Sequence, residues 1–158
     1  MHPRAASFAE QAREAHGFDP AVEEFTEGTK TAADAADAIG CDVGQIASSL
    51  AFDVDGSLVV AVTSGANRVS EGALGEHFGT TADAVSMADP DRISQTLGWS
   101  IGGVPPFCHE ESVPVIMDET LLGYDTVWAA AGTPEAVFPI DPETLREYAG
   151  ATPISVTA

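Results

Sequence analysis

Two strand-like segments joined by an acidic turn constrain the fold of this chain more than any other feature. Residues 46–52 (IASSLAF) and 58–62 (LVVAV) are mostly apolar, and Asp53-Val54-Asp55-Gly56 lies between them. Two such runs separated by a few turn-forming residues are typical of a β-hairpin. The fold must therefore accommodate this pair of antiparallel strands.

Short helices and further strands are predicted around this hairpin. Helices are expected at residues 5–16, 31–39, 70–77 and 89–97, with a last one opened by Asp141-Pro142, because caps, prolines and glycines mark their ends. Further strands are expected at residues 21–25, 84–87, 113–117, 126–131 and 136–140. Hairpins mixed with short helices, without a regular βαβ rhythm, predict an α+β fold with a mixed, largely antiparallel sheet and flanking short helices.

The composition is that of a globular protein. Hydrophobic residues make up 44% of the 158, which excludes an acidic disordered tail, because disorder requires low hydrophobicity together with high charge. A chain of this length is expected to form one domain over residues 1–158. No apolar run is long enough for a membrane span, and the chain begins without a signal-peptide pattern. We therefore expect a cytoplasmic protein with no membrane partner.

The charge is strongly unbalanced. The chain has 25 Asp and Glu against 6 Lys and Arg, a net charge of -19. Self-repulsion of this size destabilises a compact state in dilute buffer, and it is screened when molar salt shortens the Debye length to about 3 Å. We expect a protein from a halophile, with a merely acidic protein from a mesophile as the alternative. Cys41 and Cys108 have no disulfide-framework or metal-site spacing, so no metal site is expected.

One loop has an unusual composition. Gly102-Gly103 is followed closely by Pro105-Pro106. Adjacent glycines allow positive φ angles and close approach of a ligand, while the prolines fix the chain beyond them and remove competing donors. The combination indicates a rigid loop whose glycine N–H groups are available to a carbonyl or phosphate. An ordinary tight crossover is the alternative.

Six short motifs occur along the chain, at residues 32–40 (AADAADAIG), 44–50 (GQIASSL), 87–90 (MADP), 102–107 (GGVPPF), 115–118 (VIMD) and 131–132 (AG). In this order and spacing they resemble the YbaK/ProX family, the free-standing relatives of the editing domain of bacterial prolyl-tRNA synthetase. The resemblance covers nearly the whole chain. It implies a mixed α+β fold and hydrolysis of the ester that links a wrong amino acid to tRNA.

The resemblance also implies roles for several pocket residues. The family's G-x-x-x-P loop corresponds to Gly102 and Pro106, and the Gly102 amide, helped by Gly103, is expected to polarise the ester carbonyl. Gly132 corresponds to a second glycine-bearing wall, and Phe25 to the aromatic that closes the other side. Catalysis would then rest on stabilisation of the carbonyl oxygen by amides, with attack by water or a ribose hydroxyl. No cofactor is implied.

One position departs from the family pattern. The signature lysine of I-x-K-[ST]-L falls on Ser48, and the only lysine, Lys30, lies upstream. Ser49 keeps the hydroxyl that follows, and both serines are expected to hold the ribose or the amino acid. Losing the charge weakens a hydrogen bond from roughly 1.5–3 kcal/mol to about 1 kcal/mol. Asp118 is a candidate to orient the water or a ribose hydroxyl; the alternative is that it bonds backbone N–H groups of the following turn.

A cysteine beside a histidine raises the alternative of a thiol nucleophile. Adjacent side chains of an extended segment point to opposite faces, so Cys108 and His109 are not expected to meet. The family usually has glycine at this position, and Cys108 is therefore expected to trim the pocket wall. Trp99 and Trp128 are expected in the core.

Two functions remain open. The first is an aminoacyl-tRNA deacylase acting on the acceptor end; the second is a catalytically silent binding module for an aminoacyl or nucleotide group, motivated by Ser48. A charge of -19 opposes the usual Lys and Arg contacts to phosphates. Recognition is therefore expected to come from the pocket and the terminal nucleotide, in concentrated salt. DNA is not an expected partner.

Overall fold

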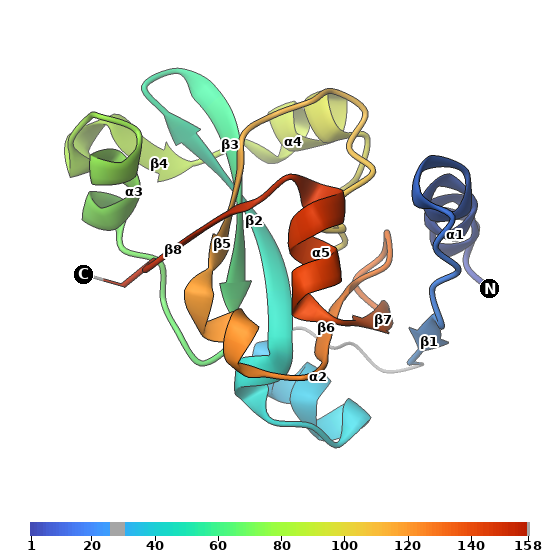
Figure 1. The fold of residues 1–158 in the computed structure, drawn as a ribbon. Helices are drawn as coiled ribbons and strands as arrows, with labels where there is room; N and C mark the ends of the chain where they lie inside the picture. The colour runs from blue at the N-terminus through green and yellow to red at the C-terminus, as the bar shows by residue number, and fades with distance from the viewer. Residues whose placement is uncertain (26–30, 158) are drawn as a thin grey trace.

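The computed structural model describes residues 1–25 and 31–157. Within this part of the chain, eight strands form one sheet in the order β1-β7-β6-β2-β3-β5-β8, and β4 pairs with β2 beside this path (Figure 1). The strands are β1 (Glu23–Glu24), β2 (Ile46–Val54), β3 (Ser57–Ser64), β4 (Val85–Met87), β5 (Val115–Asp118), β6 (Val127–Ala130), β7 (Ala136–Ile140) and β8 (Thr152–Ile154).

The sheet is mixed. β2 is antiparallel to β3 and β4, and β7 is antiparallel to β1 and β6. The pairs β2–β6, β3–β5 and β5–β8 are parallel. The expected α+β fold with a mixed, mostly antiparallel sheet is confirmed.

The predicted hairpin is present, and its turn is tighter than expected. Val54 pairs with Ser57, so only Asp55 and Gly56 form the turn. Their φ angles are 52° and 88°, both positive as a type I′ turn requires. Arg92 pairs with Asp53 and donates a hydrogen bond to the Gly56 carbonyl at 2.8 Å, which ties a helix to the turn.

The first four predicted helices end at the expected residues 16, 39, 77 and 97. The helices are α1 (Pro3–His16), α2 (Ala32–Ile39), α3 (Glu71–His77), α4 (Pro90–Leu97) and α5 (Pro142–Ala149), with single 3₁₀ turns η1 (Val43–Gln45), η2 (Ala82–Ala84) and η3 (Glu119–Gly123). Thr31 Oγ1 accepts a hydrogen bond from Asp34 N, and Gly40 ends α2 in the left-handed conformation. No described helix is long and apolar enough to cross a membrane.

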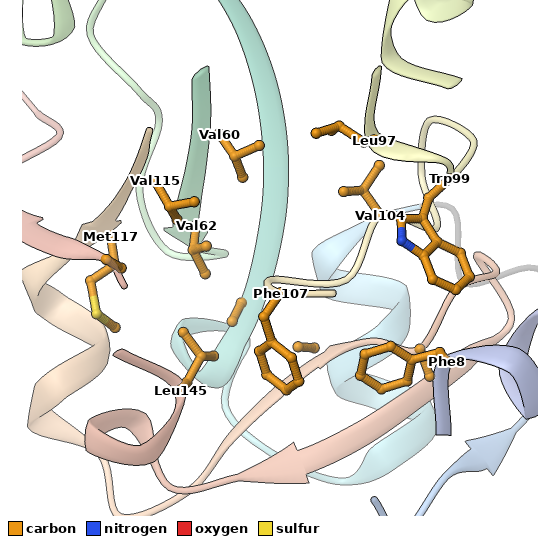
Figure 2. Packing of buried hydrophobic residues seen from close by; sticks show 14 of the residues in the cluster. Phe8, Val60, Val62, Leu97, Trp99, Val104, Phe107, Val115, Met117 and Leu145 are labelled. Carbon is orange, nitrogen blue, oxygen red and sulfur yellow. The ribbon is translucent and has the colours of Figure 1, made fainter. Parts of the chain in front are cut away.

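Alternate residues of the central strands enter two cores on opposite faces of the sheet. Val60 and Val62 of β3 belong to the larger core, which contains residues of α1, α4 and α5. Val59 and Ala61 belong to the other, beneath α3. Figure 2 shows part of the larger core, where the ring centroid of Phe8 lies 5.6 Å from that of Phe107.

Three strands differ from prediction. The strand expected at 21–25 is only two residues long, and β5 begins at Val115, after Pro114. No strand is predicted from the sequence at β8, which contains Pro153. It lies at the sheet edge, where proline is tolerated because its missing N–H costs no ladder hydrogen bond.

The backbone at Cys108 also differs from the expected extended conformation. Its φ is 64°, a left-handed angle, and its carbonyl accepts a hydrogen bond from Trp99 Nε1 at 2.9 Å. A left-handed backbone costs a residue with a Cβ about 1–2 kcal/mol, so this position suits glycine. The geometry thus gives a physical reason for the glycine that the family usually carries there.

We predict that Cys108→Gly is more stable than Cys108→Ala, by about 1 kcal/mol, because both variants lose the thiol but only glycine relieves the left-handed angle. Denaturant unfolding of the two variants in the same salt measures the difference. Cys41, which does not have a positive φ, provides the control, and there the alanine variant should be the more stable. Equal or reversed stabilities at position 108 would contradict the prediction.

Candidate functional site

A gap in the sheet creates the candidate site. β3 pairs with β2 along one edge from Ala47 to Val54, so the other two partners of β2 share the opposite edge. There β6 pairs with Ile46 and Ala47, and β4 pairs with residues 52–54. The stretch between them has no described strand beside it, and a cavity of about 240 Å³ opens at this place.

The described lining of this cavity carries no charge. Small and aliphatic side chains predominate, and the hydroxyls of Thr31, Ser48 and Ser49 are the main polar groups. The remaining lining residues come from α2, β2, β4, α4, β6, β7 and the loops beside them: Ala32, Ala35, Ile46, Ala47, Leu50, Ala51, Met87, Ile93, Ile101, Gly102, Val104, Trp128, Ala129, Ala130, Pro134 and Val137. The site is thus suited to an uncharged apolar group with few hydrogen-bonding atoms.

The two serines line the cavity from opposite faces of β2, because neighbouring side chains of a strand alternate. Ser48 shares its face with Ile46, which packs against α2. Ser49 shares its face with Ala47 and Ala51, which belong to the larger core. The Ser49 hydroxyl is buried and has no hydrogen-bond partner among the described residues.

Of the two adjacent loop glycines, only Gly102 lines the cavity. Its φ is 87°. The N–H of Gly103, which was expected to help Gly102, donates to the Ser100 carbonyl at 3.0 Å. A Cβ at Gly103 would lie 2.7 Å from Thr133 Cα. Gly103 therefore allows two backbone segments to pack closely and does not offer its amide to a ligand.

Three other predicted site residues lie outside the described lining. Pro106 is buried in the loop. Gly132, at φ 98°, packs against α1, since a Cβ there would lie 2.8 Å from the Arg4 carbonyl oxygen. Phe25 donates its N–H to the Glu135 carbonyl at 2.8 Å. Lys30 lies outside the described residues.

Asp118 is also outside the lining and is 1% exposed. Its carboxylate accepts hydrogen bonds from Ser64 N at 3.2 Å, Asn67 Nδ2 at 2.9 Å and Thr120 N at 3.0 Å. These contacts fix the chain after β3 and the start of η3. This geometry matches the alternative interpretation of Asp118, in which its carboxylate bonds backbone N–H groups.

Cys108 and His109 stay apart from the cavity. Burial raises the pKa of the Cys108 thiol to about 11, so the thiol is protonated near neutral pH and is a poor nucleophile. Burial also lowers the pKa of His109, whose Nε2 lies 2.8 Å from the Pro105 carbonyl oxygen as a donor. Among the described residues, no group of three or more His, Cys, Asp or Glu side chains is placed to hold a metal ion.

Sequence reasoning missed several lining residues. Trp99 and Trp128 were both expected in the core. Trp99 is there, at 3% exposed, whereas Trp128 is only partly buried, against the small cluster that contains Ile46, and also lines the cavity. Met87 and Ile101 are more than half exposed and also line it. Their shared position results from pairings between distant strands, for which the local sequence carries no signal.

Comparison with known proteins gives a consistent result. The family model described as "Aminoacyl-tRNA editing domain" matches residues 26–148. The protein YwhH of Bacillus subtilis (strain 168) is 30% identical over 128 residues, 80% of each chain. Proline–tRNA ligase of Staphylococcus aureus (strain Newman) is 30% identical over 86 residues, which is 54% of this chain but only 15% of the ligase.

A solved structure, of a protein proposed to be a trans-editing enzyme for prolyl-tRNA synthetase, superposes with a TM-score of 0.92 at 34% identity, covering 100% of this chain and 99% of the other. A chain used as a scaffold for epitope grafting superposes with a TM-score of 0.90 at 35% identity, with the same coverage. Fold, motif positions and family match agree, and the chain belongs to the aminoacyl-tRNA editing domain (YbaK/ProX) family.

Proposed function

We propose that this protein is a free-standing deacylase that hydrolyses the ester of mischarged aminoacyl-tRNA. The observation that carries the proposal is the uncharged cavity in the gap beside β2, with Gly102 on its wall, in a chain of the editing family. The relative proposed to act in trans covers the same length. We take residues 1–158 as one editing domain.

In the proposed reaction the amino acid enters the cavity and its ester carbonyl approaches the Gly102 N–H. This N–H has no partner among the described residues, so it is free to stabilise the negative charge that develops on the oxygen. Water attacks the carbonyl carbon; attack by the adjacent ribose hydroxyl would move the amino acid to that hydroxyl, and its release would still require water. The bond to the esterified ribose oxygen breaks, and that oxygen takes up a proton; after attack by water, the free amino acid and tRNA are released.

The net charge of -19 sets the conditions under which this reaction should run. Long-range repulsion between the protein and the phosphates of tRNA is screened in molar salt. Because the described cavity lining is uncharged, contacts inside it depend little on salt. We therefore propose a function in concentrated salt, as in a halophile's cytoplasm.

We predict release of amino acid from tRNA charged with Ala, Cys or Ser at about 2 M KCl, and slower release at about 0.1 M, where repulsion is screened less. Radiolabelled deacylation against a no-enzyme control measures this. The alternative is a binding module, favoured by the missing lysine at Ser48. Saturable binding of aminoacyl-tRNA without hydrolysis would support the module and contradict the deacylase.

A second prediction concerns the missing charge. Ser48→Lys should raise kcat/KM about fivefold, because a charge-assisted contact exceeds a neutral one by about 1 kcal/mol. The described lining offers no carboxylate to compete for the new ammonium group. Ser48→Met is the control, since it adds length without charge. A gain of the same size in the methionine variant, or no gain in the lysine variant, would contradict a role for charge at this position.

A third prediction tests the proposed carbonyl site. A Cβ at Gly102 would lie 3.4 Å from Pro134 Cγ, on the cavity wall, so Gly102→Ala should lower kcat/KM at least tenfold by narrowing the approach of the ester. Gly56→Ala is the matched control, because its φ of 88° is nearly the same as the 87° of Gly102 and nothing lies within 4 Å of its added Cβ. Both variants should lose about 1–2 kcal/mol of stability, and only Gly102→Ala should lose activity.

A further inference from the structure

We propose that Ser49 binds the aminoacyl group as one strand of a sheet binds another, with its backbone N–H donating to the carbonyl of the substrate and its backbone C=O accepting from the α-amine. This inference rests on the proposed deacylase function and names the groups that position the substrate. It concerns the backbone N–H and C=O of Ser49, which most substitutions of the side chain do not remove.

The register of the hairpin determines which way the Ser49 backbone faces. Val54 and Ser57 close a two-residue turn, so they form a hydrogen-bonded pair, and every second pair along the ladder is bonded in the same way. Ser48 and Leu50 therefore bond to β3, opposite Thr63 and Ala61. The N–H and C=O of Ser49 face the other edge of β2.

On that edge, the two neighbouring ladders stop before they reach Ser49. β6 pairs with Ile46 and Ala47 only, and the last contact from the side of β4 is the hydrogen bond from Ala88 N to Ala51 O at 3.1 Å. No described strand takes up the N–H or the C=O of Ser49, and both face the gap where the cavity lies.

The Ser49 side chain adds a third unpartnered group. Its Oγ is buried without a hydrogen bond to any described residue. A buried polar group left unpaired costs about 1–3 kcal/mol. The buried hydroxyl lies on the same residue as two backbone groups that no described strand takes up, and together they point to a ligand with matching hydrogen-bonding atoms. The described lining has no carboxylate for an amine, which leaves the Ser49 carbonyl as a suitable acceptor.

An aminoacyl group has the required pattern. In a hydrogen-bonded antiparallel pair, two opposed residues exchange both N–H···O=C bonds, and an esterified amino acid offers one amine donor and one carbonyl acceptor in the same arrangement. Paired in this way, its side chain lies on the same face as that of Ser49. That is the face of Ala47 and Ala51, where small residues leave room.

The first test changes the substrate. Alanyl and propionyl esters of adenosine differ only in the α-amine, and each rate is divided by its rate without enzyme. We expect kcat/KM to be at least tenfold lower for the propionyl ester. A ratio near one would overturn the inference while leaving the deacylase intact, whereas no hydrolysis of alanyl-tRNA or of either ester would contradict the proposed function itself.

The second test changes the backbone. Ser49→Pro removes the N–H that no ladder uses, a substitution that strand edges tolerate, and Ser49→Ala keeps both backbone groups. We expect the alanyl-to-propionyl ratio to be retained in the alanine variant and to fall towards one in the proline variant, with thermal unfolding checking that each is folded. Equal ratios in the two variants would overturn the inference. If the proline variant does not fold, the alanyl-to-propionyl ratio of the unmodified protein still tests whether the α-amine is bound.

Discussion

The pairing of β2 with three strands is the constraint on which the site depends. β3 covers one edge completely, while β6 and β4 cover only the two ends of the other. A sheet normally satisfies the backbone groups of a central strand on both sides. Here the gap leaves a short stretch of β2 open in the middle of the molecule, where α2, α4 and the 101–104 loop close around it. The cavity is therefore a consequence of strand pairing, and the helices and loops supply its walls.

Local signals in the sequence were sufficient for most of the elements. The apolar runs on either side of Asp55-Gly56 identified the hairpin, and capping residues such as Thr31 and Gly40 marked helix ends. These features act within a few residues, so the structure that they favour can be predicted without knowledge of the fold. The strand β8 is not among the predicted strands. It is short, contains Pro153 and lies at the sheet edge, a position that only the topology reveals.

The site was partly predictable for the same reason. Family motifs led to Ser48, Ser49 and Gly102, which do line the cavity. Motifs could not separate Gly102 from Gly103, because both glycines are required by the backbone, one at a positive φ and the other against Thr133. The position of Trp128 depends on the parallel pairing of β6 with β2, a contact between segments about eighty residues apart.

The N-terminal helix α1 lies before the residues that the family model matches, yet it belongs to the hydrophobic core. The family match begins at residue 26, yet Ala5, Phe8 and Ala12 of α1 are fully buried, and the ring centroid of Phe8 lies 4.9 Å from that of Phe138 in β7. A chain trimmed to the matched residues would lose Phe8 and would uncover Phe138 and Gly132, which pack against α1. The hydrophobic core of this fold therefore extends beyond the residues that the family model matches.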